Sequence, residues 1–376
     1  MKLILLTSPS QISTAVWSAF VTAHPDGTVF QSPEMYEFFS GVPGFEPVVV
    51  AVENERKELA GILLGVNIRE MKGWAGYFSS RTVVYGGPLI DPGHPDRDGV
   101  PGMLLQGLIR QVHHRSIFIQ FRNFCDPASF IPQFKTAGFH LRDRLNLIVD
   151  TSNRETAIRN MSASRWRQIR KGLGIQSVVN SQQSELRTQN SELKTQNSEL
   201  RTQNSESHAR IIVPSSLSQV REFYEILYRL YKYKIKKPLP PWEFFERFYL
   251  FSKEGKLGVI LLVEYEGNII GGILSPVTPG KTIYEWYVCG LDQEYREVHP
   301  SVLATWAAME YAFTHGIPQF DFMGVGIPER EYGVREFKKR FGGEMVNYGR
   351  FARINNRVFY AIAETGYNIL SVFRRI

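Results

Sequence analysis

The order of secondary-structure elements expected in the first half of the chain returns in the second half. In each half, two apolar strands flank a charged turn, and a later apolar strand is followed by a helix carrying a Phe-Lys pair before a glycine. The matching segments are 50–53 with 262–264, 60–63 with 271–274, 118–121 with 319–322, and Phe134-Lys135 with Phe337-Lys338. This repeat predicts two copies of one mixed α/β unit, with a ligand cleft at or between them.

The two copies differ most between Phe320 and Phe351. Asp321 interrupts an apolar strand, and the glycines that follow it predict an irregular loop whose backbone can approach a ligand closely. A short helix then places Phe337, Lys338 and Phe341 at helical spacing, and Gly342-Gly343 ends it before a strand at 345–351. Such a helix can hold a lysine ammonium at a fixed depth in a cleft.

The motifs of this run resemble those of the Fem family of aminoacyltransferases. They are Asp321-Phe322-Met323-Gly324, Tyr332-Gly333, Phe337-Lys338-Lys339-Arg340-Phe341-Gly342-Gly343 and Tyr348-Gly349-Arg350. The resemblance implies an α/β (α+β) chain of two tandem GNAT-like domains, mixed sheets flanked by helices, with Phe337 and Lys338 as the catalytic pair. It also implies aminoacyl-tRNA as donor, no cofactor, and an amine of a peptidoglycan precursor as acceptor. The alternative is that Phe337 and Phe341 are core residues and Lys338 is a solvated helix lysine.

Further residues are expected to bind substrate. Lys234 is the best positional match to an arginine that the family places near the precursor's phosphates, and it follows a helix in a basic, aromatic loop. In the strand 282–289, alternation puts Tyr284 and Trp286 on one face and Glu285 and Tyr287 on the other. The substrate-binding residues predicted in this way are Lys234, Tyr284, Trp286, Asp321, Gly324, Tyr332 and Arg350.

Length and composition predict two domains with a junction between them. A chain of 376 residues exceeds one typical core. We expect a first domain over 1–150, which ends in a strand at 139–149, and a second over 211–376. Residues 151–210 between them carry a basic helix and then a polar heptad repeat, whose three leucines leave no complete apolar seam. Residues 181–207 are therefore expected to be a mobile, dispensable insertion.

A net charge of +7 and a pI near 9.2 favour an acidic partner. The basic helix 162–172 and the loop after the first helix of the second domain are the candidates for gripping tRNA phosphates. Their basic residues are Arg165, Arg167, Arg170, Lys171 and Lys232. The alternative is that these side chains form an ordinary solvated face.

The expected compartment is the cytoplasm. The chain has two cysteines, Cys125 and Cys289, far apart and without the spacing of a disulfide framework or a metal site. The first ten residues contain too short an apolar run for a signal peptide. The apolar C-terminus with Arg374-Arg375 leaves a peripheral membrane contact open, although a docked terminal helix is the simpler interpretation. We expect a monomer.

The predicted reaction is acyl transfer from an ester to an amine, which builds an interpeptide bridge. Acetyl-CoA enzymes of the GNAT class normally have a glycine-rich loop before the helix at 301–315, and residues 295–302 contain no glycine. Lys338 is expected to stabilise developing charge, while Asp321 either acts as the base or anchors its loop. The family's nucleotide-binding members have a lysine near 31–39, which is absent here, so a lipid-linked, a nucleotide-linked or another acceptor stays open. The alternatives are an acyl-CoA or acyl-carrier-dependent N-acyltransferase, and a non-catalytic RNA- or glycan-binding protein.

Overall fold

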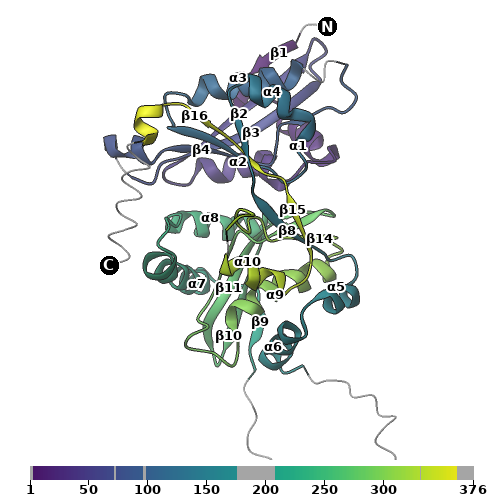
Figure 1. Cartoon of the computed structure of the whole chain (residues 1–376), viewed down its shortest axis with the longest axis vertical. Helices are drawn as coiled ribbons and strands as arrows, with labels where there is room; N and C mark the ends of the chain where they lie inside the picture. The colour runs from purple at the N-terminus through teal and green to yellow at the C-terminus, as the bar shows by residue number, and fades with distance from the viewer. Residues whose placement is uncertain (1–2, 72, 96–98, 176–207, 331, 362–376) are drawn as a thin grey trace, which may run out of the picture.

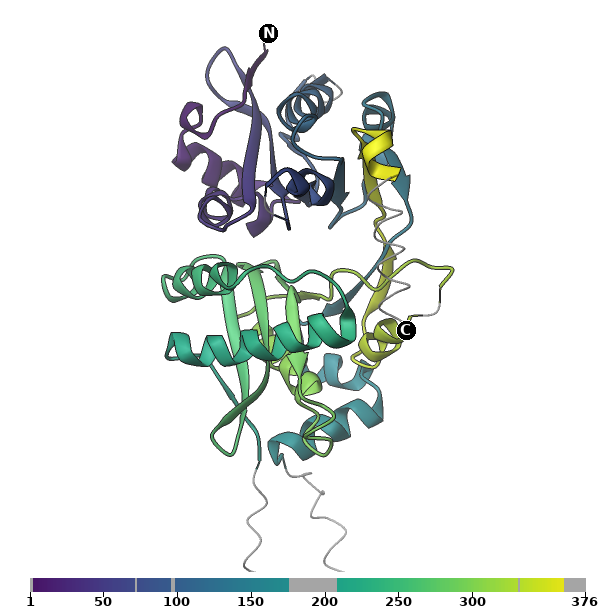
Figure 2. The same ribbon diagram turned by 90° about the vertical axis from the view of Figure 1, so that its left-hand side faces the viewer.

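The computed structural model describes residues 3–71, 73–95, 99–175, 208–330 and 332–361. These residues form two eight-stranded mixed sheets, stacked along the long axis of the molecule (Figures 1 and 2). Helices flank both sheets, so the fold class predicted from the repeat is confirmed.

The first sheet has the strand order β1-β2-β3-β4-β6-β16-β7, with β5 beside β3. Only β4 and β6 pair in parallel. Its strands are β1 (Leu3–Leu6), β2 (Phe45–Asn54), β3 (Leu59–Ile68), β4 (Arg81–Tyr85), β5 (Leu89–Ile90), β6 (Phe118–Arg122), β7 (His140–Arg142) and β16 (Arg350–Ile354). Helices α1 (Thr14–Ala23) and α2 (Pro33–Ser40) pack on one face, and α3 (Gly99–Val112) and α4 (Ile131–Thr136) on the other. Alternate strand residues point to opposite faces, which lets β2 supply both cores.

The second sheet repeats this plan in the order β15-β8-β14-β12-β11-β10-β9, with β13 beside β11. Its strands are β8 (Leu145–Asp150), β9 (Arg210–Ile212), β10 (Gly258–Tyr265), β11 (Asn268–Thr278), β12 (Thr282–Tyr284), β13 (Tyr287–Gly290), β14 (Gln319–Asp321) and β15 (Glu344–Asn347). Helices α7 (Leu217–Leu230) and α8 (Trp242–Lys253) pack on one face. The other face packs against α9 (Pro300–Thr314), with α5 (Arg154–Asn160), α6 (Ala163–Leu173) and α10 (Gly333–Lys339) around it. Only β12 and β14 pair in parallel, as β4 and β6 do in the first sheet.

The sheets do not divide at residue 150, because the two copies exchange a strand. The segment 139–149, expected as one strand of the first domain, breaks at Asp143–Arg144 into β7 in the first sheet and β8 in the second. The segment 345–351 breaks in the same way at Gly349 into β15 and β16. A continuous apolar pattern shows that a segment is extended, but it does not show which sheet completes its hydrogen bonds.

The exchanged strands run side by side as an antiparallel ribbon that joins the two sheets (Figure 1). β8 pairs with β15, and β7 pairs with β16. At the crossing, Gly349 N donates to Arg144 O at 3.3 Å and Arg144 N donates to Asn347 Oδ1 at 3.0 Å. Gly349 has a φ of 64°, a conformation that glycine adopts without steric cost. The ribbon therefore fixes the two sheets to each other through backbone bonds.

A shared aromatic core also joins the two copies. The ring of Trp286 packs edge-on against Phe30 of the first copy and Phe244 of the second, at centroid distances of 5.2 and 5.0 Å. Phe38 on α2 packs edge-on against Phe244 on α8 at 4.9 Å, and Arg247 Nε donates to Phe38 O at 3.2 Å. The interface is thus part of the protein interior.

Candidate active site

The candidate site lies where the parallel strands β12 and β14 end. Tyr284 is opposite Asp321, and Glu285 N then donates to Asp321 O at 2.9 Å. Beyond this bond the backbone changes course on both sides. The β12–β13 strand is interrupted at Glu285–Trp286, and Met323 adopts a φ of 61°. Asp321 stabilises this turn, because its Oδ1 accepts the Met323 N–H at 2.6 Å.

Helix α10 brings Lys338 to the same strand ends. The Lys338 ammonium lies 2.8 Å from Glu285 Oε1 and donates to Phe322 O at 2.8 Å. The other oxygen of Glu285 accepts from Thr305 Oγ1 on α9 at 3.2 Å. The side chains of Lys338 and Glu285 are only 10% and 3% exposed. Lys338 is therefore one member of a buried ion pair, and the solvated-lysine alternative is wrong.

Burial raises the pKa of the Asp321 carboxyl to about 6. The neighbouring carboxylate of Glu285 also raises the pKa, whereas the bonds from Met323 N and Asn146 and the charge of Lys338 lower it. Asn146 Nδ2 lies 3.3 Å from Asp321 Oδ2 and reaches the site from the exchanged strand β8. Asp321 therefore changes its protonation state close to neutral pH, as a general base requires.

Arginine side chains hold the loop after β14 and the helix α10 in place. Arg335 on α10 is buried and donates to the carbonyl oxygens of Val325, Ile327 and Pro328. Arg165 on α6 donates to Phe337 O at 2.9 Å, and its guanidinium lies 4.3 and 4.5 Å from the ring centroids of Phe337 and Phe341. Half-buried Phe337 thus supports α10 through its ring and its carbonyl group.

The predicted phosphate contact through Arg165 needs correction. Its side chain is buried, and burial lowers its pKa to about 10. It packs against α10 because Phe337 and Phe341 offer ring faces to a cation. Of the other residues in the predicted set, Arg167 is exposed, Arg170 is half-buried, and Lys171 forms an ion pair with Glu297. Lys232 and Lys234 are exposed in the turn Tyr231–Ile235 after α7, and Lys232 lies over the Tyr233 ring at 5.2 Å.

Two predicted substrate-binding residues lie in the shared aromatic core. Tyr284 is 3% exposed and packs against Phe30 and Phe124, and Trp286 packs against both copies. Both side chains therefore contribute to the packing between the two copies. The alternation of the strand correctly predicted that Tyr284 and Trp286 point to the same side. That side of the strand faces the first copy.

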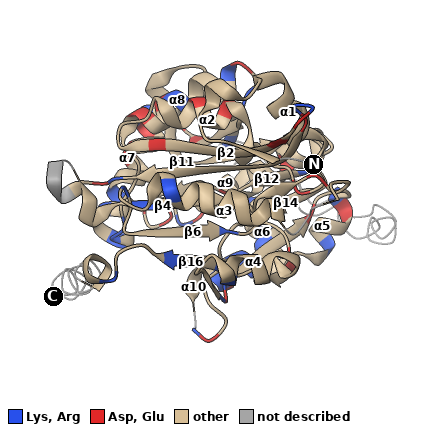
Figure 3. Cartoon of the chain, turned by 90° about the horizontal axis from the view of Figure 1, so that it is seen from above, with Lys and Arg blue, Asp and Glu red and all other residues tan. Residues whose placement is uncertain are grey.

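The remaining predicted residues lie around the loop after β14, with Arg350 beside Gly324 and Tyr332 beside Gly326. A Cβ atom on Gly324 would lie 3.1 Å from Arg350 Nη2, so Arg350 reaches the loop after β14 from the first sheet. Tyr332 precedes α10 and is 37% exposed. Figure 3, seen from above, shows Lys and Arg segments on β16 and beside α10.

The sequence did not single out Glu285, Thr305 and Asn146. Glu285 had the same signal as Asp321, since it is an acidic residue within an apolar strand. Its alternation partner Tyr287 was noted, but no lysine was close enough in sequence to suggest a pair. Thr305 and Asn146 come from a helix and from the exchanged strand, and only the tertiary fold places them at the site.

The N-terminus of α9 is closed by an acidic side chain. Ser301 N donates to Asp292 Oδ1 at 3.0 Å, and Val302 N and Leu303 N donate to His299 O. A helix N-terminus favours anions because its amides are free and its dipole is positive. Here a carboxylate already occupies that position, so a phosphate group would meet like charge.

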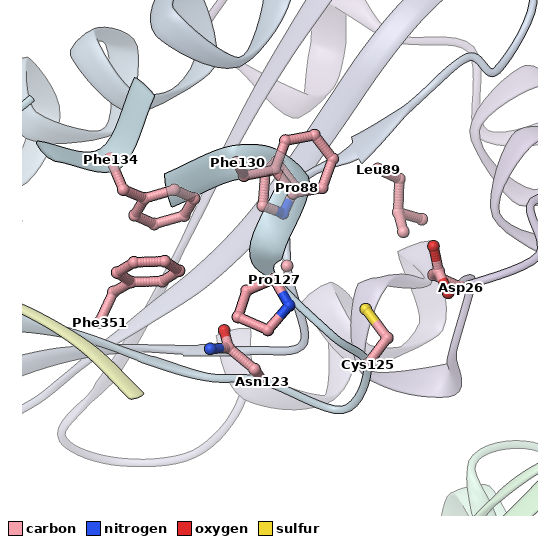
Figure 4. Close-up of a pocket in the computed structure, with 10 residues that line it drawn as sticks. Asp26, Pro88, Leu89, Asn123, Cys125, Pro127, Phe130, Phe134 and Phe351 are labelled. Atoms are coloured by element: carbon pink, nitrogen blue, oxygen red, sulfur yellow. The ribbon is translucent and has the colours of Figure 1, made fainter. Parts of the chain in front are cut away.

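The corresponding part of the first copy has no ion pair. Phe134 is buried, and its ring stacks on Phe351 at a centroid distance of 3.9 Å, while Lys135 is exposed (Figure 4). A cavity of about 10 Å³ beside these rings is lined by Asp26, Gly87, Pro88, Leu89, Asn123, Cys125, Pro127, Phe130, Phe134 and Phe351. A space of this size is close to the limit for one water molecule.

Two further features concern metals and membranes. Within the described ranges, no three or more His, Cys, Asp and Glu side chains are grouped so that they could hold a metal ion. No helix in those ranges is long and apolar enough to cross a membrane. The C-terminal segment that was considered for membrane contact lies outside the described residues.

Comparison with known proteins identifies the class of the second copy. Residues 190–339 match the model of the acetyltransferase (GNAT) domain family, and this range includes Glu285, Asp321 and Lys338. The aminoacyltransferase FemA of Staphylococcus aureus is 30% identical over 90 residues, which is 23% of this chain and 21% of FemA. The match thus spans about a fifth of this curated relative. Membership of the Fem family stays a prediction from the motifs.

Solved structures show the same fold along most of the chain. A tandem GNAT protein from the clavulanic acid biosynthesis pathway aligns with a TM-score of 0.54 at 10% identity, covering 94% of this chain and 99% of that one. The L-PGS structure from Bacillus licheniformis aligns with a TM-score of 0.52 at 10% identity, covering 95% and 96%. Together with the domain match, these similarities support an acyltransferase of the GNAT type.

Proposed function

We propose that this protein transfers an aminoacyl group from the ester of aminoacyl-tRNA to an amine of a peptidoglycan precursor. The observation that carries the proposal is the buried Lys338–Glu285 pair beside Asp321 at the ends of β12 and β14. Burying charges is costly, and a cluster with a strongly shifted carboxyl pKa is a mark of a functional site.

The cluster offers the two functions that acyl transfer needs. The amine nitrogen bonds to the ester carbonyl carbon and loses a proton, and the carbon–oxygen bond to the ribose then breaks and the ribose oxygen takes up a proton. Lys338 has three N–H donors, of which Glu285 and Phe322 O use two, so the third is available to a developing oxyanion. Asp321, largely ionised at pH 7, accepts the amine proton and returns it to the ribose oxygen.

The choice of donor is supported by the N-terminus of α9. An acyl-CoA donor needs a place for its pyrophosphate, and in this chain the strand-to-helix junction has no glycine at 295–302 and carries Asp292 on Ser301 N. Aminoacyl-tRNA has no pyrophosphate that would have to bind at the N-terminus of this helix. The similarity to an aminoacyltransferase, FemA, agrees with this donor.

The choice of acceptor follows from the same similarity and from the Fem motifs. Helix α2, near which nucleotide-binding members have a lysine, buries Met35, Phe38 and Phe39 in the shared core. Both lipid-linked and nucleotide-linked precursors therefore remain candidates, and the assay has to offer both.

The test is an acyl-transfer assay with a matched set of donors. Purified protein is given a mixture of radiolabelled aminoacyl-tRNAs or radiolabelled acetyl-CoA, each with the lipid-linked or the nucleotide-linked precursor. We expect label to pass to a precursor from aminoacyl-tRNA only. Transfer from acetyl-CoA with none from aminoacyl-tRNA would overturn the proposed donor.

The second candidate is an N-acyltransferase that uses acyl-CoA or an acyl carrier protein on a cell-envelope substrate. One observation favours it: the match at 190–339 is to a family described as acetyltransferases. An Asp292→Gly variant separates the candidates. Because it removes the carboxylate from the α9 N-terminus, an acyl-CoA enzyme should bind acetyl-CoA more tightly, whereas tRNA-dependent transfer should change little.

A further inference from the structure

The first sheet has a row of arginines on one of its faces. Arg142 on β7 pairs directly with Arg350 on β16. Continuing the β16–β6 register, in which Ala352 pairs with Gln120, places Arg350 opposite Arg122. Neighbouring strands are about 4.8 Å apart, so three guanidinium groups start from adjacent positions on one face. Like charges directly opposite each other destabilise a sheet.

These arginines have few partners that would offset their charge. Among the described residues, the guanidinium groups of Arg142, Arg144 and Arg350 make no hydrogen bond or ion pair. Arg122 donates to Tyr85 Oη and to Gln120 Oε1, which are neutral groups, and lies over the Tyr85 ring at 5.1 Å. The row thus presents uncompensated positive charge.

Arg142, Arg144 and Arg350 line a cavity of about 110 Å³, far larger than the space of one water molecule. Its lining consists of Phe118, Gln120, His140, Arg142, Asp143, Arg144, Arg350, Ala352, Ile354 and Tyr360. The single carboxylate of this lining, Asp143, accepts from Asn347 Nδ2 at 2.8 Å. Burial, followed by the nearby positive charges of Arg122 and Arg144, lowers the pKa of Arg350.

We propose that Arg144 and Arg350, which line this cavity, together with Arg122 opposite Arg350 on β6, form a binding site for a phosphate or diphosphate group. Guanidinium groups donate paired hydrogen bonds that match phosphate oxygens, and several of them together suit a dianion or trianion. In the free protein the guanidinium groups repel one another, whereas a bound anion would attract all of them. The energetic cost of placing these cations together is therefore offset only when the anion is bound.

The position of the site connects it to the reaction. Arg350 Nη2 lies 3.1 Å from where a Cβ of Gly324 would be, on the loop that Asp321 anchors. A phosphorylated group held there belongs to a molecule that can reach the β12 and β14 strand ends. Its assignment to the acyl acceptor rests on the proposed function, whereas the existence of the site does not.

The test measures binding without any acyl donor. Inorganic pyrophosphate and inorganic phosphate are titrated into the full chain by calorimetry, and thermal unfolding is followed with and without them. We expect pyrophosphate to bind and to raise the melting temperature. Arg350→Met and Arg144→Met should each weaken binding on the order of tenfold or more. Arg229→Met on α7, which removes an exposed positive charge elsewhere on the molecule, is the control and should bind as the wild type does.

Stability without ligand gives a second readout. Removing one cation from a repelling row should leave the melting temperature of Arg144→Met and Arg350→Met unchanged or higher. Arginines with a merely structural role would instead lower it. The proposal is overturned if wild-type protein binds no pyrophosphate, or if both variants bind it as tightly as the control does.

Vesicles identify the source of the phosphate. Phosphatidylglycerol vesicles that displace pyrophosphate, where phosphatidylcholine vesicles do not, would assign the site to a lipid headgroup. Pyrophosphate binding that neither vesicle affects would assign it to a soluble phosphorylated ligand. Because no acyl transfer is measured, failure of this test leaves the proposed reaction standing, and failure of the reaction leaves the binding result standing.

Discussion

The two copies of the α/β unit use the same Phe-Lys position in opposite ways. In the second copy, Lys338 is buried against Glu285, and the helix that carries it is clamped by Arg165 and Arg335. In the first copy, Phe134 fills the interior by stacking on Phe351, and Lys135 is exposed. A matching sequence therefore does not imply a matching site.

The difference continues along the paired strands. Gln120 in the first copy corresponds to Asp321, so the first copy has no acid at that strand position. On this strand the first copy instead continues to Arg122, in the arginine row. One copy thus concentrates buried opposite charges, and the other displays unpaired positive charge. Under the two proposals made above, the second copy would carry out catalysis and the first would bind the anion.

The largest expected effect is that of Lys338→Met. We expect the rate of acyl transfer to fall on the order of a hundredfold or more, because an oxyanion donor is lost. The free energy of unfolding should also fall by about 3–5 kcal/mol, because Glu285 is left buried and unpaired. Rate assays and denaturant unfolding measure the two effects.

Two variants make this result specific. In Lys338→Met with Glu285→Gln, much of the stability should return while the rate stays low, since the buried carboxylate is gone. Lys135→Met, the matched change in the first copy, should alter neither quantity. A rate loss in Lys135→Met equal to that in Lys338→Met would break the comparison between the copies.

The next effect concerns Asp321, for which the first copy has no counterpart. The rate should rise as pH increases through about 6, and Asp321→Asn should lower the rate and remove this rise. Stability should change in the other direction. The pKa of Asp321 is 3.8 in the unfolded chain and about 6 in the folded protein, so the folded protein binds the proton more tightly. The free energy of unfolding should therefore fall as pH rises from 3.8 to about 6 and stay level above that. Asp150→Asn, an exposed acid on β8, is the control; a pH profile of Asp321→Asn that matches the wild type would exclude Asp321 as the base.

A smaller effect is expected at the ribbon that joins the copies. Gly349→Ala should lower the free energy of unfolding by roughly 1–3 kcal/mol, because its φ is 64° and a Cβ would lie 2.7 Å from Leu141 Cδ1. Gly102→Ala on α3 meets no atom within 4 Å and should be neutral or stabilising. Equal stabilities for the two alanine variants would show that the crossing tolerates a side chain.

The smallest effect is expected from deleting Ser181–Ser207, which lie outside the described residues. The chain on either side is already close, because Ala209 N donates to Gly172 O at 2.9 Å. A short glycine linker should therefore leave the melting temperature within roughly 2 °C of the wild type. A larger drop would mean that the insertion contributes to holding the copies together.

The sequence predicted the fold well where the pattern is local. The strands around the turns at 54–58 and 266–268 and the repeated order of elements are periodic signals, and the structure has them. The strand exchange was missed because hydrogen-bond partners in a sheet are set by distant segments. The two extended runs 139–149 and 345–351 gave no sign that each would serve two sheets.

For the site, the sequence identified Asp321 and Lys338 but not their partners. An acidic residue in an apolar strand and a lysine on an amphipathic helix can be recognised from the sequence alone. The Lys338–Glu285 pair joins two separate elements, and the sequence does not show that these elements meet. Arg165 was placed wrongly because helical spacing shows which residues share a face, but not that α6 packs against Phe337. The arginine row was invisible for the same reason, since Arg122 and Arg350 come from strands far apart in the chain.

The exchanged strand also sets the order in which the protein can be completed during synthesis. β6 pairs with β16, and Phe118 pairs with Ile354. The edge of β6 therefore stays uncovered until Ile354 has left the ribosome. Until then the nascent first copy carries an exposed strand edge, which is a template for wrong pairing. A pause late in synthesis would therefore leave this strand edge exposed for longer.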